Sequence, residues 1–238
     1  MNFRNDQFSR KSSTGIIFFS RTRNCEARSK KWHPSHSKNL EIAHHLIEST
    51  KSVLHSTGHD VIIIDETKQH GDSFGEKIQS AFQDTFELGY TQLILVGNDS
   101  VGLSEAYISD SIHFLQENDC VFGSTRENGL YLIGFERSFF LEKSEQIAGL
   151  PWRSKYLSRA FSELANFEGK SILPILSDLN TIEDIRHLLK NRFDVFTEVI
   201  RKITHGCLEL FDRELFSVIR IYEFNKVKKR GPPSACVS

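Results

Sequence analysis

The sequence predicts one α/β domain with a mixed, mainly parallel sheet flanked by helices. Three short apolar runs, at residues 15–20, 60–65 and 92–97, have the continuous hydrophobic pattern of strands that are buried on both faces. A segment with helical features follows each of the three runs. Because strands that alternate with helices form parallel sheets covered by helices, this order indicates an α/β fold.

The first half of the chain repeats the order strand, loop, helix. After the first run, residues 21–31 are expected to form a basic loop, and residues 39–57 show apolar positions at helical spacing. After the second run, Ser73 and Glu76 match a capping box that starts a helix ending near Leu88. After the third run, Ser104 is expected to cap a helix that ends near Glu117.

The second half of the chain predicts that the sheet is mixed, with both parallel and antiparallel strands. Residues 119–123 and 130–135 are expected to form two strands joined by a turn-rich connection. A helix over about 154–167, a short strand over 171–176 and a helix that opens at Thr181 complete the prediction.

Four regions are expected along the chain. They are a flexible N-terminus (1–14), the α/β domain (15–190), a helical C-terminal extension (191–224) and a disordered basic tail (225–238). The 238 residues, 39% of them hydrophobic, suffice for one sizeable core but hardly for two full domains. Within the extension, residues 193–224 carry Phe and Leu at helical intervals and are a candidate surface for a protein partner.

Composition excludes several classes of function. With 30 basic and 31 acidic residues the net charge is −1, so no nucleic-acid partner is expected. The four cysteines form no C-x-x-C pair, which argues against a zinc knuckle and a disulfide framework and fits the reducing cytoplasm. Neither a secretion signal nor a membrane span is predicted. We therefore expect a cytoplasmic protein and leave its oligomeric state open.

Asp99 is the first candidate site residue. It follows the third predicted strand, and in parallel sheets ligands bind beyond the carboxyl ends of the strands. A carboxylate there can hold Mg²⁺ or Mn²⁺ together with the phosphate oxygens of a ligand. The alternative is an aspartate that caps the next helix or hydrogen-bonds its own turn.

The basic residues after the first strand are the second candidate. Arg21, Arg23 and Lys30 lie where they could stabilise the charge of a diphosphate. The alternative is a surface loop whose charges are incidental. The segment has neither a P-loop nor a dinucleotide-binding pattern.

The connection between the fourth and fifth predicted strands is the third candidate. Glu127 and Asn128 offer oxygen ligands, and Gly129 allows close approach of the backbone to a ligand. A plain turn is the alternative. The histidines form no metal triad, and without a G-x-S-x-G motif no hydrolase is indicated.

Five segments carry further patterns in order: Gln69-x-Gly71-x-x-x-Gly75-Glu76, residues 93–99, residues 121–134, Pro151-Trp152 and residues 178–184. Together they resemble a bacterial family of glycosyltransferase-A-like proteins, also described as nucleotide-diphospho-sugar transferase-like, whose substrates are mostly undefined. The resemblance covers about residues 15–190 and implies a Rossmann-like glycosyltransferase-A fold. It also implies that Asp99 faces a metal, that the loop after the first strand contacts phosphates or base, and that the Glu127 region closes over the sugar or acceptor. Gly97 and Asn98, beside Asp99 in the second pattern, are expected to contact the substrate.

Departures from the family pattern leave two functions open. Ser100-Val101 replaces Cys-Pro, Glu127-Asn128 replaces Asp-Gly, and the first loop lacks the usual proline-glycine and K-T-R-L pattern. The first function is a glycosyltransferase or nucleotidyltransferase that depends on a divalent cation and acts on a nucleotide-diphospho-sugar or sugar phosphate. In it Asp99 anchors the cation, and Glu127 binds the cation or orients the acceptor hydroxyl. The alternative is a catalytically degenerate binding or scaffold protein of the same fold.

Overall fold

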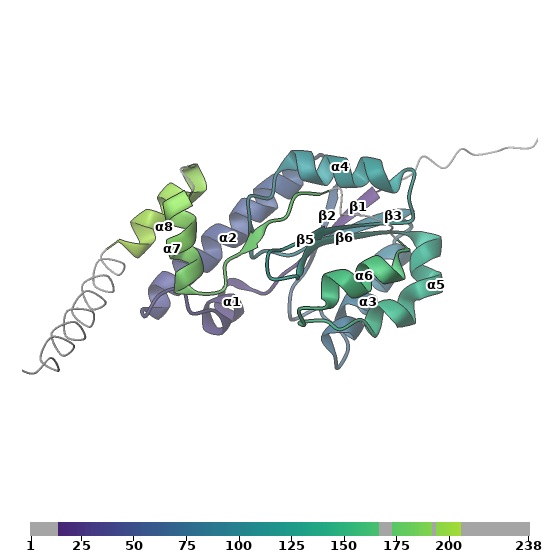
Figure 1. Ribbon diagram of the computed structural model, residues 1–238, viewed down its shortest axis with the longest axis horizontal. Coiled ribbons are helices and arrows are strands. Elements are labelled where there is room, and N and C mark those ends of the chain that lie inside the picture. Colours follow the sequence, from purple (N-terminus) through teal and green to yellow (C-terminus); the bar gives the residue numbers. More distant parts are fainter. Residues whose placement is uncertain (1–13, 167–172, 192–193, 206–238) are drawn as a thin grey trace, which may run out of the picture.

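The computed structural model describes residues 14–166, 173–191 and 194–205. Its centre is a five-stranded sheet with the strand order β2-β1-β3-β6-β5 (Figure 1). β1 (Thr14–Phe19) pairs in parallel with β2 (Asp60–Ile64) and β3 (Gln92–Val96). β6 (Leu130–Glu136) runs antiparallel to β3 and to β5 (Cys120–Ser124). The mixed, mainly parallel sheet predicted from the sequence is confirmed.

Helices cover both faces of the sheet (Figure 1). One face carries α3 (Phe74–Glu87), α5 (Arg137–Ala148) and α6 (Leu157–Leu164), and the other carries α2 (His36–Ser56) and α4 (Glu105–Leu115). Successive residues of β1 point to opposite faces, so Ile17 and Phe19 pack in one core and Ile16 and Phe18 in the other. Burial on both faces explains why the strand has no alternation of apolar and polar residues.

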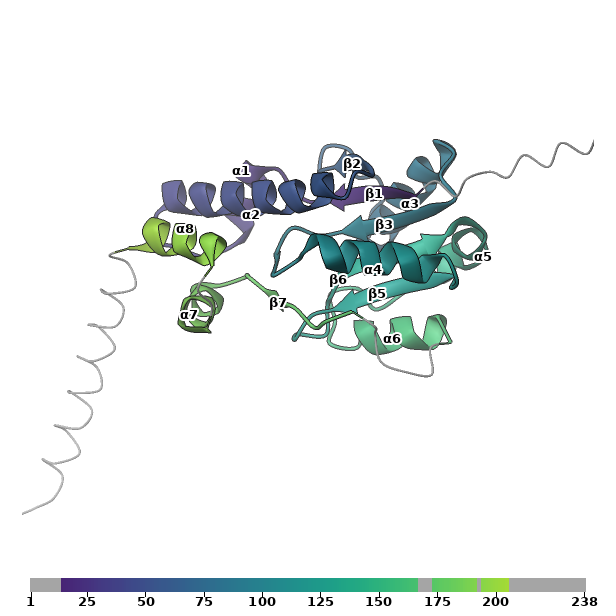
Figure 2. The ribbon, with the colours of Figure 1, turned by 90° about the horizontal axis from the view of Figure 1, so that it is seen from above.

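A third hydrophobic cluster lies beyond the carboxyl edge of the sheet. It is built from α2 together with three further helices: α1 (Arg23–Ser29), α7 (Ile182–Asn191) and α8 (Val195–Thr204). Figure 2 shows α7 and α8 beside α2, away from the sheet. Trp32 is fully buried in this cluster, and its Nε1 donates a hydrogen bond to the Leu179 carbonyl oxygen at 3.0 Å. The bond ties the segment after α1 to the segment before α7.

A short antiparallel pair links the sheet to the third cluster. β4 (Ser100–Val101) directly follows the loop after β3, and it pairs with β7 (Ser177–Asp178). Ser100 lies opposite Asp178 in this pair. The pairing therefore brings residues 177–180 to the same edge of the sheet as residues 97–101.

Two local expectations are corrected in the first half of the chain. The expected basic loop at 21–31 contains α1, which begins where the Thr22 hydroxyl accepts a hydrogen bond from the Cys25 amide at 3.4 Å. The side chain of Glu66 accepts hydrogen bonds from the amide and hydroxyl of Thr22, which fixes the start of this helix. β2 is the edge strand of the sheet and is largely half-buried, so the expectation of a strand buried on both faces was wrong.

The second half differs in three places. Within the expected strand at 171–176, the described residues 173–176 form only an isolated bridge between Leu176 and Thr125, and the paired strand β7 comes directly after them. The helix expected from 154 begins at Leu157. Helix α5 was not predicted, because only Phe140 and Ile147 of its residues are buried and the positions between them on the same face, Lys143 and Ser144, are polar.

Several predicted helix starts are present. Ser73 and Glu76 form the capping box of α3, and the Ser104 side chain caps α4. Of the expected C-terminal extension, α8 is described, whereas residues 206–238 and the N-terminal residues 1–13 lie outside the described residues. Among the described residues, no helix is both long and apolar enough to cross a membrane.

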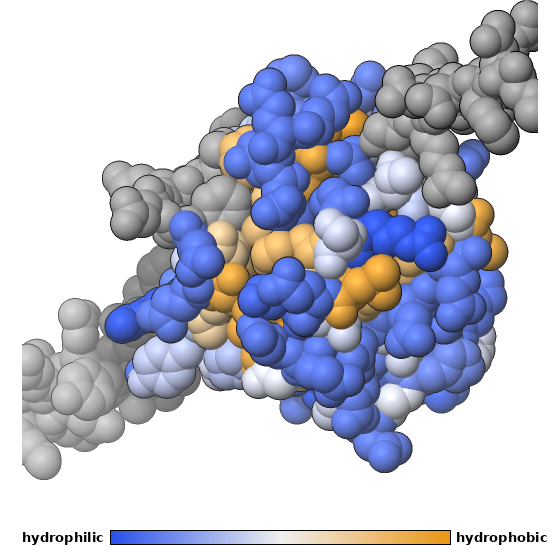
Figure 3. Space-filling model, turned by 90° about the vertical axis from the view of Figure 1, so that its right-hand side faces the viewer, coloured by the Kyte–Doolittle hydropathy of each residue, from blue (hydrophilic) through white to orange (hydrophobic). Residues whose placement is uncertain are grey.

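The end of the molecule that carries α5 has a mixed surface. Hydrophobic side chains gather near the middle of this face and are surrounded by hydrophilic ones (Figure 3). Leu141 of α5 and Leu88, just after α3, are 60% and 69% exposed. This face is at the opposite end of the molecule from α7 and α8 (Figure 1).

Candidate functional site

A cavity of about 660 Å³ opens at the carboxyl ends of β1 and β3, where β6 begins. We call it the central cavity. Its charged and amide-bearing lining residues come from the loops after β1, β2 and β3, from α1, from the start of α3, and from segments near 152 and 178. They include Arg21, Glu26, Lys30, Glu66, Gln69, Asn98, Asp99, Asp178 and Asn180. These groups meet because parallel strands end at the same edge of a sheet.

Asp99 forms an ion pair with Lys30 in this cavity. Lys30 Nζ lies 3.1 Å from Asp99 Oδ2 and also donates a hydrogen bond to Asn180 Oδ1. The Lys30 side chain is only 13% exposed, whereas that of Asp99 is 35% exposed. The cap of α4 is Ser104, so Asp99 does not have the helix-capping role that was the alternative.

Glu26 lies beside two of the basic residues of the cavity, Lys30 and Arg21. It is 2% exposed, with Lys30 Nζ at 3.8 Å from its Oε1 and Arg21 Nη1 at 3.7 Å from its Oε2. Burial raises the pKa of Glu26, and the neighbouring charge of Lys30 opposes that rise. The buried carboxyl group of Glu26, on α1, therefore orients the side chains of Lys30 and Arg21.

Asp178 is a site residue that the sequence analysis did not select. It lies beside Asp99, because β7 pairs with β4 and the Leu179 amide donates a hydrogen bond to the Asp99 carbonyl oxygen at 2.8 Å. Burial raises the pKa of Asp178 to about 6, and the charge of Asp99 adds to the rise. The Ser100 hydroxyl donates a hydrogen bond to Asp178 Oδ1. The signal was its place at the start of the fifth motif.

Asn98 has an unused hydrogen-bond donor. Its side chain is 7% exposed and lines the central cavity, and its Nδ2 is buried without a partner among the described residues. A buried donor without a partner costs about 1–3 kcal/mol. Asn98 thus carries an N–H group at the cavity with no hydrogen-bond partner among the described residues.

The remaining predicted residues divide into two groups. Gly97 and Gly129 line the central cavity. Arg23 is exposed and lines a separate cavity of about 280 Å³. Glu127 and Asn128 are exposed in the turn between β5 and β6, where the φ of Asn128 is 61°. None of these last three residues lines the central cavity, although the charge of Glu127 adds to the raised pKa of its neighbour Asp178.

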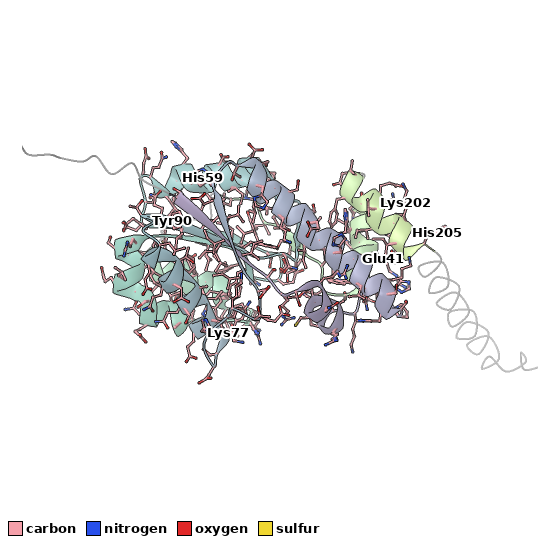
Figure 4. The ribbon with its side chains drawn as sticks, turned by 180° about the vertical axis from the view of Figure 1, so that it is seen from behind. Glu41, His59, Lys77, Tyr90, Lys202 and His205 are labelled. Atoms are coloured by element: carbon pink, nitrogen blue, oxygen red, sulfur yellow. The ribbon has the colours of Figure 1, made fainter. Side chains whose placement is uncertain are left out.

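The other part of the cavity is aromatic. The Phe74 ring is in edge contact with Phe19 and Trp152, at centroid distances of 6.0 and 5.6 Å, and Arg153 Cζ lies 4.8 Å from the Phe74 centroid. Lys77 of α3 also lines it. Figure 4 shows Lys77 well apart from His59 and Tyr90, which lie near the opposite ends of the strands. The cavity thus combines a charged part with an aromatic surface that carries two further cations, Lys77 and Arg153.

Comparison with known proteins gives one family and several structures. Residues 59–154 match the family model described as an uncharacterized protein conserved in bacteria (DUF2064). No curated protein matches the chain by sequence.

Among solved structures, a candidate nucleotide-diphospho-sugar transferase from Desulfovibrio desulfuricans G20 has a TM-score of 0.65 and 21% identity, and the match covers 80% of this chain and 95% of that one. A 4-diphosphocytidyl-2C-methyl-D-erythritol synthase from Anaerococcus prevotii has a TM-score of 0.45 and 10% identity, over 74% and 94% of the two chains. The mannosyltransferase PcManGT from Pyrobaculum calidifontis, in complex with GDP-Man and Mn²⁺, has a TM-score of 0.36 and 9% identity, over 81% and 70%. The chain has the glycosyltransferase-A-like fold and matches the bacterial family DUF2064 over residues 59–154, which confirms the resemblance inferred from its motifs.

Proposed function

We propose that this protein is a metal-dependent transferase that acts on a nucleotide-diphospho-sugar or a sugar phosphate. One observation supports the proposal above all. Asp99 and Asp178 lie side by side at the carboxyl edge of the sheet, next to Lys30, in a cavity of about 660 Å³ that Arg21 also lines. A cavity of this volume is in the range of small-molecule sites.

The two aspartates fit the requirements of a divalent cation. Mg²⁺ is commonly held by one or two carboxylates together with substrate phosphates. The described residues contain no group of three or more His, Cys, Asp or Glu side chains that could hold a metal, so the protein would supply Asp99 and Asp178 and the ligand the other oxygens. When bound, the cation would neutralise charge on the diphosphate.

The other residues of the charged part would bind the ligand. Arg21 and Lys30 would contact phosphate oxygens, with the guanidinium able to make two parallel hydrogen bonds. Asn98 would donate its free N–H to a ligand oxygen. Glu127 does not line the central cavity, but its charge acts on Asp178, and it would orient the acceptor. Arg23 and Asn128 have no place in this proposal, because they neither line the cavity nor act by their charge on Asp178.

A second function, ligand binding without catalysis, is favoured by the position of Lys30. Its ammonium is held on Asp99 by contacts with Glu26 and Asn180, where it neutralises the aspartate in the way that a bound cation would. A protein that keeps this ion pair when a nucleotide binds would not need a metal.

Thermal unfolding with nucleoside diphosphates and nucleotide-sugars, with and without Mn²⁺, tests both functions. A ligand that binds only the folded state raises stability by about 2.7 kcal/mol at 100 times its Kd. The transferase proposal expects a rise in Tm that needs nucleotide and Mn²⁺ together, is lost in Asp99→Asn and Asp178→Asn, and is kept in the control Arg23→Gln.

The remaining outcomes separate the two functions. A rise that is independent of Mn²⁺, without release of nucleoside diphosphate from any nucleotide-sugar, would support the binding protein and contradict the transferase. The absence of a rise with every nucleotide would contradict both functions.

A further inference from the structure

A second hollow of about 540 Å³ adjoins the central cavity at the C-terminal end of α1. We call it the basic groove and define it by Arg28, Lys30, Lys31, His33, His36 and Asn39, which are among its lining residues. All six come from α1, from the start of α2 and from the connection between these helices. None of the residues that line the groove is acidic.

Lys30 is paired with Glu26 and Asp99, but the other two basic side chains of the groove, those of Arg28 and Lys31, have no carboxylate partner among the described residues. Arg28 and Lys31 are exposed and form no ion pair with any described residue. By contrast, Lys38 and Lys51 of α2 pair with glutamates of the same helix, at 3.1 and 3.0 Å. The groove therefore has free cations in a concave surface, which is the arrangement that an anionic ligand requires.

Lys30 connects the groove with the central cavity. It belongs to the lining of both, and its ammonium contacts Asp99. The wall between the two hollows is well anchored, since Ala27 and Trp32 are buried in the third cluster and Lys31 forms a bridge with Thr181. The two hollows thus share Lys30, whose ammonium group lies at Asp99.

We propose that the basic groove binds a phosphate monoester on the second substrate, the one that reacts with the nucleotide-linked ligand of the central cavity. This inference rests on the proposed transferase function. A phosphate monoester fits better than a carboxylate because two unpaired cations, Arg28 and Lys31, line the same hollow, and arginine and lysine together suit a dianion with three acceptor oxygens. A nucleic acid fits less well, because the hollow has the volume of a small-ligand site and the chain has a net charge of −1.

Titration calorimetry with glucose 6-phosphate, glucuronate and glucose tests the groove directly. We expect the folded wild-type chain to bind glucose 6-phosphate more tightly than glucuronate and to show no binding of glucose. The double variant Arg28→Gln/Lys31→Gln should bind glucose 6-phosphate about tenfold or more weakly, since each lost charge-assisted hydrogen bond weakens binding by roughly that factor. Its Tm should not change, because both side chains are exposed.

The matched control removes the same charge from α1 and α2 at positions outside the groove. Arg23 and Lys51 line the separate cavity of about 280 Å³, so Arg23→Gln/Lys51→Gln should keep wild-type affinity for glucose 6-phosphate. Equal weakening in the two double variants, or absence of glucose 6-phosphate binding by the wild type at millimolar concentration, would overturn the proposal. Equal affinity for glucuronate would overturn the phosphate assignment.

Two further measurements separate this inference from the proposed function. Asp99→Asn should keep glucose 6-phosphate binding, because Asp99 does not line the groove. Arg28→Gln/Lys31→Gln should in turn keep the Tm rise with nucleotide and Mn²⁺. If the wild type shows no Tm rise with nucleotide and Mn²⁺ but still binds glucose 6-phosphate, this result contradicts the transferase proposal and leaves the groove as an anion site.

Discussion

Asp99 and Asp178 show how two neighbouring carboxyl groups differ in their surroundings. Asp99 is paired with Lys30 at 3.1 Å and is partly exposed. Asp178 is more enclosed, and its hydrogen-bond partners are the hydroxyl groups of Ser100 and Thr125. Burial and the charge of Asp99 therefore raise the pKa of Asp178 to about 6, from the ordinary value of 3.8. The site keeps a carboxyl group in a place where ionisation is unfavourable.

This raised pKa predicts that Asp178→Asn stabilises the protein at neutral pH. Between about pH 4 and 6 the folded state binds more protons than the unfolded state, so the folded state loses stability as the pH rises through that window. Asparagine avoids this loss and still accepts the hydrogen bond from Ser100. We expect a gain on the order of 1–2 kcal/mol at pH 7.5 and none below pH 4, measured by urea unfolding.

The control for this prediction is Asp99→Asn, which removes the partner of Lys30 as well as the charge that adds to the raised pKa of Asp178, so its effect at pH 7.5 should be less stabilising than that of Asp178→Asn. The predicted gain in stability of Asp178→Asn should be accompanied by loss of Mn²⁺ binding, as is common where a strained group serves a function. A variant that is less stable than the wild type at pH 7.5 would contradict the burial argument.

Lys30→Gln tests whether the lysine competes with a metal. Without the ammonium, Asp99 is free to bind a cation, so the affinity for Mn²⁺ alone should rise about two- to fivefold, the equivalent of the 0.5–1 kcal/mol of a partly exposed ion pair. The affinity for a nucleoside diphosphate should fall, because a phosphate contact is lost. Titration calorimetry measures both. A fall in both affinities would mean that Lys30 only holds the loop in place.

At the scale of elements, the start of α3 contacts the end of α5 at Gly75, which has no side chain. A Cβ at Gly75 would lie 1.9 Å from the carbonyl oxygen of Ala148 and 2.8 Å from Cδ1 of Trp152. The capping box that starts α3 is adjacent, so the helix start is fixed both by its own hydrogen bonds and by this contact. The close approach places Trp152 and Phe74 at the cavity.

Gly75→Ala is therefore expected to destabilise the protein by about 2 kcal/mol or more, since the backbone of α5 must move to admit the methyl group. Gly149→Ala is the matched control. Gly149 has a φ of −78°, and the nearest atom to its added Cβ is the Glu145 carbonyl oxygen at 3.4 Å, so this change should be nearly neutral. Urea unfolding of the two variants makes the comparison, and equal stabilities would show that α5 moves freely.

At the scale of the whole molecule, the site depends on contacts between the sheet and the third hydrophobic cluster. Trp32, buried in that cluster, donates a hydrogen bond to the carbonyl oxygen of Leu179, which lies between Asp178 and Asn180. The position of Asp178 relative to Asp99 therefore depends on the packing of α1, α2 and α7 as well as on the β4–β7 pair.

Trp32→Phe should weaken Mn²⁺ binding in addition to reducing stability by about 1–3 kcal/mol, because the Leu179 carbonyl loses its buried partner. Trp152→Phe is the control. Trp152 also donates to a carbonyl, that of Ile147 at 2.9 Å, but it lies at the aromatic part of the cavity. It should change nucleotide affinity and leave Mn²⁺ affinity as in the wild type. Titration calorimetry with Mn²⁺ and with nucleotide measures the two affinities of each variant, and urea unfolding measures its stability.

The sequence by itself determined the features that depend on neighbouring residues. Continuous apolar runs favour burial on both faces, so β1 and β3 and the parallel arrangement could be predicted, although β2 proved to be a half-buried edge strand. The capping box of Ser73 and Glu76 is complete within four residues. Asp99 was predicted as a site residue because the carboxyl end of a buried strand is a general binding position.

Only the tertiary structure decided which side chains meet Asp99. Lys30 is 69 positions away from Asp99 in the chain, and Asp178 is held beside Asp99 by the β4–β7 pair. The position of Lys30 depends on α1, whose start at Thr22 is fixed by a hydrogen bond to Glu66, 44 positions further along the chain. Arg21, Arg23 and Lys30 all carry a positive charge, yet the orientation of α1 in the fold leaves Arg23 outside the central cavity. The physical reason is that charge and residue type are local properties, whereas burial and ion pairing arise from contacts between distant segments.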